Sequence, residues 1–589
     1  MYRKNTRHMQ IPLTSHVDEM PEKLKKRLEN SWAGIYYREF FTRLDEAPFA
    51  VLYTDIPSRP NVPVNVLVGL EYLKAGNGWT DEEMYDMYCF DVQVRYSLGY
   101  RQLGEGYFDL RTLYYFRERL SRYMQESGIN LLDKAFEQVT DEQITAYHLK
   151  TGKQRMDSTQ IASNIRTMSR LQLLVEVLQR VHRLLTKEDQ GRYAEMFAPY
   201  IQGHAGQYVY HIKGQDTNGH LERIGELMQR LLVELQKNYG QEPVYQMFER
   251  VFGEHYLVEE KVVRVKLEKE LSADSLQSPD DLEATYREKN NKHYKGYVAN
   301  LTETCDPANG LQLVTKVQVA GNSVDDAKLM EEALPNLKER TELETLFTDG
   351  GYGSPDADRI MQDNKVEQIQ SAIRGRVPSS EKLNLADFEL KLTETGKPTQ
   401  IACPQGQSVA VHPSNQKKGF VAHFEEQVCQ ACPFSQKCPT QKGKRDPRFH
   451  LRFSQQQVYL SQRRRRSLIH QEEGRNIRAS VEATVRQVKH PFPASKLPVR
   501  GRFRVTCMMI GSAMLTNVRR IQRYLEAKTK LENEQKKAQK EQECSQEQLS
   551  VSFFVYLKTI FSSCMAINSD CNLKFGLSIR VFAGKSLIK

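Results

Sequence analysis

Three acidic residues lie where carboxylates could meet in a folded chain. Asp157 lies within residues 153–161, a segment whose mixture of polar and apolar side chains is typical of a half-buried strand. Asp349 directly follows a short apolar segment, residues 345–348, and Glu482 lies in a helical segment nearer the end of the chain. Two divalent metal ions that promote phosphoryl transfer need hard oxygen ligands that are held rigidly. The three carboxylates therefore predict a phosphoryl-transfer site.

The elements that must position these carboxylates follow one another in an informative order. We expect strands at residues 153–161, 293–304, 311–320, 345–348 and 366–373, and helices at residues 165–256, at 324–334 (stopped by Pro335), between 353 and 366, and at 455–488. Three strands, then strands alternating with helices, predict an α/β core of the ribonuclease H-like fold. In such a core Asp157 and Asp349 can meet at one edge of the sheet, and the last helix supplies Glu482.

Basic residues share one face of that last helix with Glu482. At about 100° per residue, Arg475, Arg478 and Lys489 lie within about 40° of Glu482 around the helix axis. Beside them runs an apolar seam that can pack the helix on a sheet; it consists of Ile477, Val481, Val485 and Val488. A carboxylate among three cations suits a metal ligand flanked by groups that bind phosphate. The alternative is an ordinary surface ion pair between Arg478 and Glu482.

Positive charge is concentrated in one part of the chain. Residues 442–504 contain 17 lysines and arginines against 4 aspartates and glutamates, including the run Arg463, Arg464, Arg465 and Arg466, whereas the whole chain has 84 against 74 and a net charge of +10. Such a stripe is expected of a protein that binds a polyphosphate backbone, and we predict that it contacts double-stranded DNA. The alternative is a well-solvated helix, although such surfaces usually mix both signs.

Four cysteines are spaced as in a structural metal site. Cys403 is followed by the pair Cys429 and Cys432 and then by Cys438. Four thiolates can close a tetrahedral zinc site, which would stabilise a segment with little apolar content. His423 or His450 could replace one of the thiolates. The alternative is four unrelated reduced cysteines.

The remaining chain favours several domains. A length of 589 residues predicts about four folding units. We expect an all-α, DNA-binding N-terminal domain at residues 1–140, with helices starting at Thr80 and near Asp109, although small helical bundles without a DNA role share this pattern. The catalytic domain is expected at 141–523, with a helical insertion at about 165–290 and a cysteine-rich insertion at about 395–450. Residues 524–589 then form a charged linker and an apolar tail of unknown role.

Composition excludes several classes of protein. Hydrophobic residues make up 39% of the chain, which excludes a wholly disordered protein. No stretch of 18 apolar residues is uninterrupted, and the N-terminus lacks the apolar segment of a signal peptide. We therefore expect a cytoplasmic protein without a membrane span.

The chain resembles bacterial insertion-sequence transposases with a DDE catalytic core and an InsH-like helical N-terminal domain. The matching segments, within about residues 40–523, are LVGLEYLKAGNGWTDEEMYDMYCFDVQVRYSLGY, TLYYFRERL, RMDSTQI, SPDDLEATYREKNNKHYKGYVANLTET, LFTDGGYGSP, EGRNIRASVEATVRQVKH and LPVRGRFRV. The resemblance implies that Asp157, Asp349 and Glu482 bind Mg²⁺ or Mn²⁺. Similar cysteine clusters occur at this place in those transposases.

Arg478 and Lys489 match the basic positions of a Tyr-x2-Arg-x3-Glu-x6-Lys signature, whereas Arg475 occupies the tyrosine position. This departure puts in doubt any role that requires an aromatic ring there.

The resemblance implies an enzyme that binds the terminal inverted repeats of a mobile element and cleaves and transfers DNA strands. We expect it to act as a homodimer on DNA, because two transposon ends must be brought together. As a DNA-binding protein it is also expected to associate with the bacterial nucleoid. Two alternatives are a catalytically inactive, transposase-derived regulator that binds DNA and a ribonuclease H-like nuclease of repair or RNA processing. The regulator would not need three carboxylates, and the nuclease would not need a DNA-reading N-terminal domain.

Overall fold

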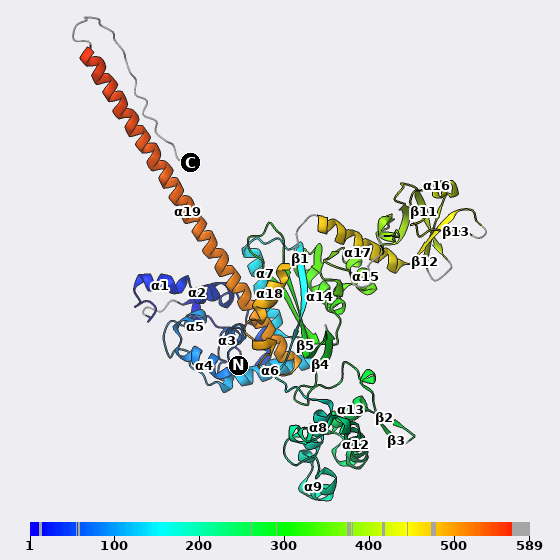
Figure 1. Cartoon of the computed structure of the whole chain (residues 1–589). Coiled ribbons are helices and arrows are strands. Elements are labelled where there is room, and N and C mark those ends of the chain that lie inside the picture. Colours follow the sequence, from blue (N-terminus) through cyan, green and yellow to red (C-terminus); the bar gives the residue numbers. More distant parts are fainter. Residues whose placement is uncertain are drawn as a thin grey trace. The chain divides into compact units, whose positions relative to one another are not determined.

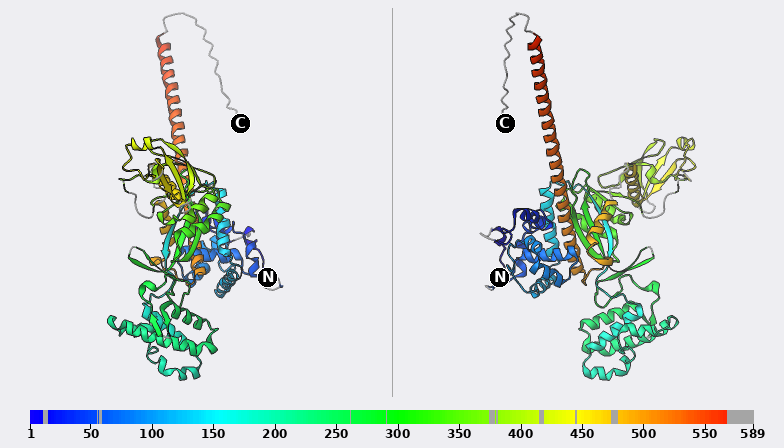
Figure 2. Two further views of the ribbon diagram at one scale, coloured as in Figure 1. Left: turned by 90° about the vertical axis from the view of Figure 1, so that its right-hand side faces the viewer. Right: turned by 60° about the vertical axis from the view of Figure 1, so that its left-hand side comes forward.

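The computed structural model describes residues 1–10, 15–54, 56, 59–260, 262–289, 291–373, 379, 381–414, 419–443, 446–472 and 479–567. Its contacts divide the chain into two units, Met1–Gln522 and Arg523–Lys589. Figure 1 shows the elements of the first unit, which contains two six-stranded sheets, and Figure 2 shows them from two further sides.

The N-terminal part of the first unit is helical. Its helices are α1 (Glu22–Glu29), α2 (Trp32–Tyr36), α3 (Val64–Asn77), α4 (Asp81–Phe90), α5 (Val92–Ser97), α6 (Arg111–Ser127) and α7 (Leu131–Ala146). Thr80 and Glu83 form the expected capping box at the start of α4. The helices pack around fully buried aromatic side chains, among them Tyr36, Phe40, Tyr72 and Phe116. The predicted helix starts near Thr80 and Asp109 are confirmed.

A mixed sheet forms the centre of the unit. Its strands are β1 (Lys153–Ile161), β4 (Thr285–Lys289), β5 (Lys292–Thr304), β6 (Val314–Gly321), β7 (Thr345–Thr348) and β8 (Glu367–Gln370). Strand β5 pairs antiparallel with β1, β4 and β6, while β1, β7 and β8 run parallel to one another. The five expected strands thus lie in the order β6-β5-β1-β7-β8, which agrees with the predicted ribonuclease H-like core.

Helices cover both faces of this mixed sheet. Met156 of β1 joins a buried cluster with side chains of α14 (Asp326–Arg340) and α15 (Pro355–Asp363). The prediction that Pro335 stops α14 was wrong, because the helix continues through it to Arg340. Proline removes one backbone donor. The extra turns nevertheless bury Leu337 and carry Arg340 to its ion pairs, which offsets that loss.

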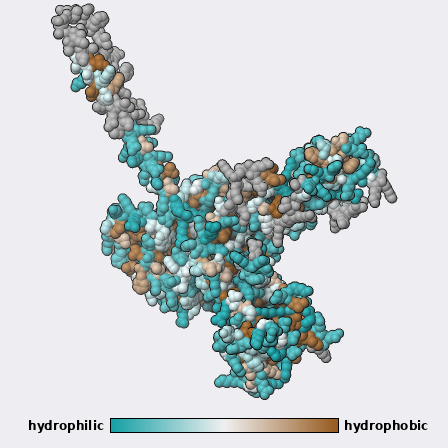
Figure 3. Space-filling view, in the orientation of Figure 1, coloured by the Kyte–Doolittle hydropathy of each residue, from teal (hydrophilic) through white to brown (hydrophobic). Residues whose placement is uncertain are grey.

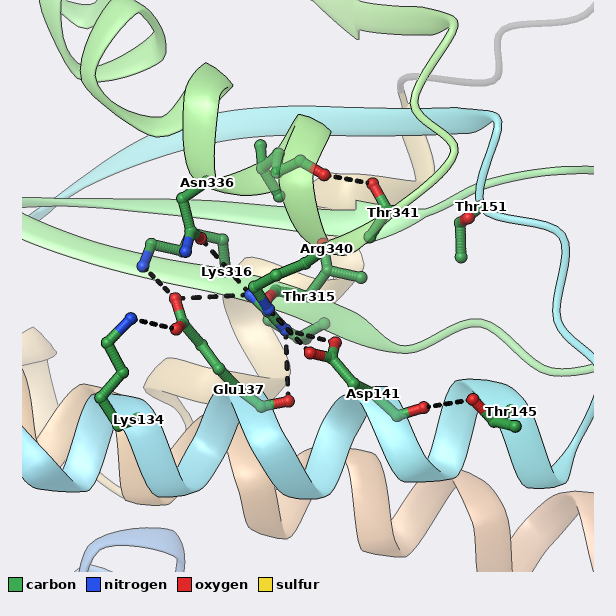
Figure 4. Close-up of polar contacts among 12 residues, drawn as sticks. Lys134, Glu137, Asp141, Thr145, Thr151, Thr315, Lys316, Asn336, Arg340 and Thr341 are labelled. Carbon is green, nitrogen blue, oxygen red and sulfur yellow. Dashed lines mark hydrogen bonds and ion pairs between the residues drawn. The ribbon is translucent and has the colours of Figure 1, made fainter. Parts of the chain in front are cut away.

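Ion pairs fix helix α7 to the sheet and to α14. Lys316 of β6 reaches Glu137 on α7 at 2.5 Å, and Arg340 of α14 reaches Asp141 at 2.6 Å (Figure 4). Lys134, on the same helix as Glu137, donates to the other oxygen of that carboxylate, Oε2, at 3.0 Å (Figure 4). The N-terminal helices are therefore anchored to the mixed sheet by charged groups as well as by apolar packing.

A separate group of helices follows β1 in the sequence. It consists of α8 (Arg170–Leu184), α9 (Lys187–Arg192), α10 (Ala194–Phe197), α11 (Ala205–Tyr210), α12 (Thr217–Tyr239) and α13 (Pro243–His255), with a hairpin of β2 (Tyr256–Glu259) and β3 (Val262–Val265). Leucine and valine side chains of α8 pack with α12 and α13 in one buried cluster. In the sequence, these elements lie between β1 and β4.

A second, antiparallel sheet follows β8. Its strands are β9 (Glu389–Leu392), β10 (Pro398–Ala402), β11 (Ser408–Ser414), β12 (Gly419–Phe424), β13 (Gln441–Lys442) and β14 (Phe449–Phe453), in the order β13-β14-β12-β11-β10-β9, and α16 (Glu426–Gln430) lies between β12 and β13 in sequence. Its core is small and includes Phe388, Ile401, Phe424 and Leu451.

The last helices return to the mixed sheet. Two helices, α17 (Gln455–Glu472) and α18 (Ala479–Lys489), occupy the segment expected as one helix, and residues 473–478 lie outside the described part. Helix α19 (Arg502–Ile567) begins in the first unit, where it packs on α3 through Leu515 and Gly76.

The second unit consists, over its described residues, of the remainder of α19. Apolar side chains near its end, including Phe553 and Phe554, are exposed. Figure 3 shows brown, hydrophobic atoms on the surface of this long helix. Over the part of the chain that the structure describes, none of the helices combines the length and apolar character that a membrane span requires.

Candidate functional site

The two predicted aspartates lie side by side at the carboxyl ends of parallel strands. Arg155 of β1 is paired with Phe347 of β7. This is the last observed pair, and β7 ends at Thr348. Continued two residues further, the same register would bring Asp157 next to Asp349 on one face of the sheet, because side chains alternate with a period of two. Neighbouring strands are about 4.8 Å apart, so the two carboxylates can share ligands. Asp157 is 8% exposed, and Asp349 Oδ1 accepts the Gly351 N–H at 2.7 Å.

Helix α18, which carries Glu482, lies against the same face of β1 (Figure 1). Thr484 donates to Glu303 Oε2 of β5 at 2.7 Å, and Lys489 Nζ donates to Thr159 Oγ1 of β1 at 2.9 Å. Asp157 lies on β1 between these two anchors. At about 100° per residue, Glu482 lies within about 20° of Lys489 around the helix axis but about 100–160° from the buried Val481, Thr484 and Val488, so it leaves the helix beside the face that packs on the sheet. Glu482 is exposed, and its buried neighbours Val481 and Val488 form part of the expected apolar seam.

A buried glutamate that the sequence did not reveal holds this arrangement together. Glu303 has a side chain that is 0% exposed, and it accepts from Arg155 Nε at 2.6 Å and from Arg520 of α19 at 2.6 Å. With Thr484, these contacts tie β1, β5, α18 and α19 at one point. In the sequence, Glu303 is visible only as a charged residue within an otherwise half-apolar strand, and this pattern does not distinguish it from surface glutamates.

Asp326 is a further carboxylate near Asp349. A Cβ on Gly351 would lie 2.9 Å from both Asp326 Oδ2 and Asp349 Oδ1, so glycine keeps these oxygens accessible. Asp326 Oδ1 is buried without a hydrogen-bond partner, although Arg287 lies 3.6 Å away. Burial raises the pKa of the Tyr352 hydroxyl well above its ordinary value, and Asp326, Asp157 and Asp349 add to this effect. The Tyr352 hydroxyl donates a hydrogen bond to Asn300 Oδ1 at 2.7 Å.

Two hollows adjoin the carboxylates and have opposite character. The first, of about 520 Å³, is lined by Asp325, Asp326 and Asp349 among others. The second, of about 630 Å³, lies along the end of β1, and its lysines are Lys289, Lys295, Lys489 and Lys496. Lys289 lines both hollows. The structure thus places a basic channel beside an acidic site, and Lys289, Lys295 and Lys496 were not among the predicted residues.

Two lysines of the basic hollow are held in place by backbone carbonyl groups. Lys295 Nζ donates to Met168 O at 2.8 Å, and Lys496 Nζ donates to Ile165 O at 3.1 Å. Burial lowers the pKa of Lys295 and of Lys489. An ammonium group that has already lost part of its hydration gains more from a phosphate oxygen than an exposed one.

The predicted arginines fall into two groups. Arg475 and Arg478 lie outside the described residues. In α17, Arg463 pairs with Asp358 of α15 at 3.2 Å, Arg465 pairs with Glu389 of β9 at 3.1 Å, and Arg466 pairs with Glu367 of β8 at 3.2 Å. The run thus links α17 to both sheets. Arg464, the fourth member, has its pKa lowered by burial and by the neighbouring Arg463.

The four predicted cysteines converge on one face of the antiparallel sheet. Cys403, Cys429, Cys432 and Cys438 line one hollow of about 30 Å³, together with Phe424 and Phe449. Burial raises the pKa of the Cys429 thiol to about 11, and the other three cysteines contribute to this shift. Four thiols are a suitable ligand set for a Zn²⁺ ion. Among these cysteines, all of which the structure describes, no three sulfur atoms lie within 4.8 Å of one another, so binding of one ion would require the thiols to move closer together.

The expected alternative, in which a histidine replaces a thiolate, was wrong. His423 precedes Phe424 on β12 and pairs with His450 on β14, whereas Phe424 pairs with Phe449. Since side chains alternate along a strand, the histidines lie on the face opposite the thiols.

Comparison with known proteins adds one finding. The chain matches none of the curated proteins and none of the solved structures. Residues 402–522 match a family model described as a transposase DDE domain; the matched segment runs from the end of β10 through the cysteines, α17 and α18 to the start of α19. Of the three predicted carboxylates it contains Glu482. The match supports a DDE transposase, an enzyme that cleaves and transfers DNA.

Proposed function

We propose that the chain is a DNA transposase that binds the terminal inverted repeats of an insertion sequence and catalyses metal-dependent strand cleavage and strand transfer. The observation that supports this proposal is the parallel pairing of β1 and β7, whose register, continued two residues further, would bring Asp157 next to Asp349, and the contact of β1 with α18, the helix that bears Glu482. A regulator that only binds DNA would gain nothing from carboxylates arranged in this way.

The donor set fits divalent metal ions. Asp157, Asp349 and Glu482 offer hard oxygen atoms. Asp326, whose buried Oδ1 has no hydrogen-bond partner among the described residues but lies 3.6 Å from Arg287, lines the same hollow as Asp349. Bound Mg²⁺ or Mn²⁺ would supply the activation of the attacking oxygen and the stabilisation of the leaving oxygen. Glu303 and Thr484 would act as positioning residues because they fix α18, and with it Glu482, over β1.

The basic hollow supplies a path for the DNA backbone. Lys289, Lys295, Lys489 and Lys496 would bind phosphates next to the carboxylates, so that a scissile phosphate lies over Asp157 and Asp349. Water would first cleave the strand and release a 3′-hydroxyl group. This hydroxyl group would then attack a phosphate of the target DNA, and the displaced 3′-oxygen of the target would take up the proton that the attacking group loses.

Other parts of the chain would hold the DNA. Residues 1–140 would recognise the transposon ends, while Arg463, Arg464, Arg465, Arg466, Arg475 and Arg478 would contact phosphates. Residues 141–523 would form the catalytic domain, with insertions at about 165–290 and 395–450. Two copies would act together in the bacterial cytoplasm, at the nucleoid, because two ends must be joined.

We also propose that Cys403, Cys429, Cys432 and Cys438 bind a structural zinc ion. The convergence of four thiols on one small hollow supports this. A small apolar core gives the antiparallel sheet little stability of its own, and a metal ion would supply the remainder.

Cleavage of labelled DNA that carries the sequences flanking the gene would test the proposed function. Wild type should cut at defined positions with Mg²⁺ or Mn²⁺, and Asp349→Asn should lower cleavage by about 1,000-fold or more, since metal binding supplies several kcal/mol. DNA binding should be retained in that variant. Asp363→Asn, at the end of α15, is a matched control that should cleave normally. Binding without metal-dependent cleavage in the wild type would instead support an inactive, DNA-binding regulator.

A further inference from the structure

A second group of metal-ligating side chains lies on the antiparallel sheet, on the face that the thiols do not occupy. His423 on β12 and His450 on β14 are paired across the strands, and their ring centroids are 4.6 Å apart. Asp446, just before β14, brings Oδ2 to 3.7 Å from His450 Nε2. One ligand atom from each of the three residues lies within 4.8 Å of the other two.

Both imidazoles present a nitrogen atom that the described protein leaves unsatisfied. His423 Nδ1 and His450 Nε2 are buried and have no hydrogen-bond partner. Native proteins rarely leave buried polar atoms in this state unless a ligand or water satisfies them. Residue 443 also keeps the nitrogen accessible because it is glycine: a Cβ there would come within 2.4 Å of His450 Nε2.

We propose that His423, Asp446 and His450 bind one Zn²⁺ ion, separate from the thiol site. Two imidazoles and a carboxylate favour zinc over Mg²⁺ or Ca²⁺, which prefer oxygen ligands only. In a tetrahedral zinc site, bonds of about 2.0–2.1 Å place ligand atoms roughly 3.4 Å apart, so the three side chains need only small movements.

A neighbouring cation orients the carboxylate ligand. Arg448 Nη2 donates to Asp446 Oδ2 at 2.7 Å, and its Nε lies 3.0 Å from both carboxylate oxygens. Asp446 Oδ1 also accepts the backbone N–H of Arg448 at 3.1 Å, so Oδ2, the oxygen nearer His450, is the ligand atom that we infer. A hydrogen-bonding partner of this kind typically fixes a ligating carboxylate. The ion would tie β14 and the turn before it to β12.

A third histidine on this sheet lies outside the group. His412 on β11 lies on the same face, because it pairs with Val421, two residues before His423. It is exposed, and its ring centroid lies 6.0 Å from that of His423, outside the group. His412 therefore provides a matched control, with the same chemistry on a neighbouring strand.

The metal content of the full-length chain tests the proposal. Protein saturated with Zn²⁺ and then desalted should contain one zinc equivalent more per chain in the wild type than in a His423→Gln/His450→Gln double variant. His412→Gln should match the wild type. The difference of one equivalent is expected whether or not the thiols hold zinc. Substitution with Co²⁺ separates the two sites, because only the thiol site gives a thiolate-to-cobalt charge-transfer band, and the double variant should keep that band.

Asp446→Asn provides a second measurement if the double variant does not fold. The side chain lies at the surface of a turn, so the variant should fold normally and bind the second Co²⁺ ion about tenfold more weakly or worse. Equal zinc content in the wild type and a folded double variant, or equal Co²⁺ affinity in the wild type and Asp446→Asn, would overturn the proposal.

Discussion

The two six-stranded sheets of this chain satisfy their buried polar groups in different ways. In the mixed sheet, Glu303 has three protein partners, and apolar side chains of α14 and α15 cover the opposite face. In the antiparallel sheet, four thiols converge on one small hollow, and His423 and His450 keep buried nitrogen atoms without hydrogen-bond partners among the described residues. Oxygen atoms of the mixed sheet, at Gln160, Thr302, Gln368 and Gln370, are also buried without hydrogen-bond partners among the described residues. The contrast therefore concerns the charged and metal-ligating groups: protein contacts stabilise the Glu303 network, whereas the antiparallel sheet would depend on the zinc ions proposed above.

The largest effect that this comparison predicts is the loss of the antiparallel sheet when its zinc is removed. Structural zinc contributes about 10–16 kcal/mol in small zinc-binding peptides, which is comparable to the whole stability of a domain. Cys432→Ser should therefore unfold β10–β14 while the mixed sheet stays folded. Hydrogen exchange should show lost protection in residues 398–453 and normal protection in β1, β5 and β7. Cys89→Ser, in the N-terminal helices, is the matched control, and unchanged protection in Cys432→Ser would argue against a structural metal.

A smaller effect is expected from breaking the ion network of the mixed sheet. Glu303→Gln removes the charge that faces two largely buried arginines, Arg155 and Arg520. Removing one partner of a buried ion pair costs about 3–5 kcal/mol of the free energy of unfolding. Chemical denaturation of the purified protein measures this loss. The control is Glu344→Gln, at an exposed residue just before β7, which should change stability by less than about 0.5 kcal/mol. A loss in Glu303→Gln as small as in the control would show that the network is not essential.

The sequence predicted the mixed sheet better than the antiparallel sheet, because the two sheets differ in the length of their strands and in the size of their apolar cores. The strands of the core have apolar periodicity, and Asp157 and Asp349 stand at positions that the strand order alone brings together. The antiparallel sheet has short strands and a small core, so only its cysteines gave a signal. Glu303 and the lysines of the basic hollow became visible only in three dimensions, because residues far apart in the sequence make their contacts. The helix through Pro335 was mispredicted because tertiary contacts of Leu337 and Arg340 outweigh the local preference of proline.

The contact between α15 and α17 offers a test that depends on pH. Burial raises the pKa of the Asp358 carboxyl from 3.8 to about 6, although Arg463 and Arg466 act in the opposite direction. A raised folded-state pKa means that the folded protein binds the proton more tightly than the unfolded chain. The stabilisation is therefore fully present below about pH 3.8 and is lost as the pH rises through about 6.

Relative to Asp358→Asn, the wild type should lose on the order of 2–3 kcal/mol of the free energy of unfolding between pH 4 and pH 7. Denaturant titrations of both proteins at these pH values give the difference. Asp356→Asn, an exposed change on the same helix, should show no such pH-dependent difference from the wild type. A constant difference between the wild type and Asp358→Asn would mean that Arg463 keeps Asp358 ionised throughout.

The smallest effect on stability is expected where the arginine run meets each sheet at the surface. Arg466 pairs with Glu367 of the mixed sheet and Arg465 with Glu389 of the antiparallel sheet, and all four side chains are at least one-third exposed. Arg465→Gln and Arg466→Gln should each change the free energy of unfolding by only about 0–1 kcal/mol, because exposed ion pairs contribute little. If these arginines also bind phosphates, each variant should reduce the slope of log K for DNA binding against log salt by about 0.9. A salt titration of DNA affinity therefore separates two roles that a stability measurement cannot distinguish. An unchanged slope in both variants would limit the arginines to linking α17 to the sheets. A change in one variant only would identify the side of α17 along which the DNA runs.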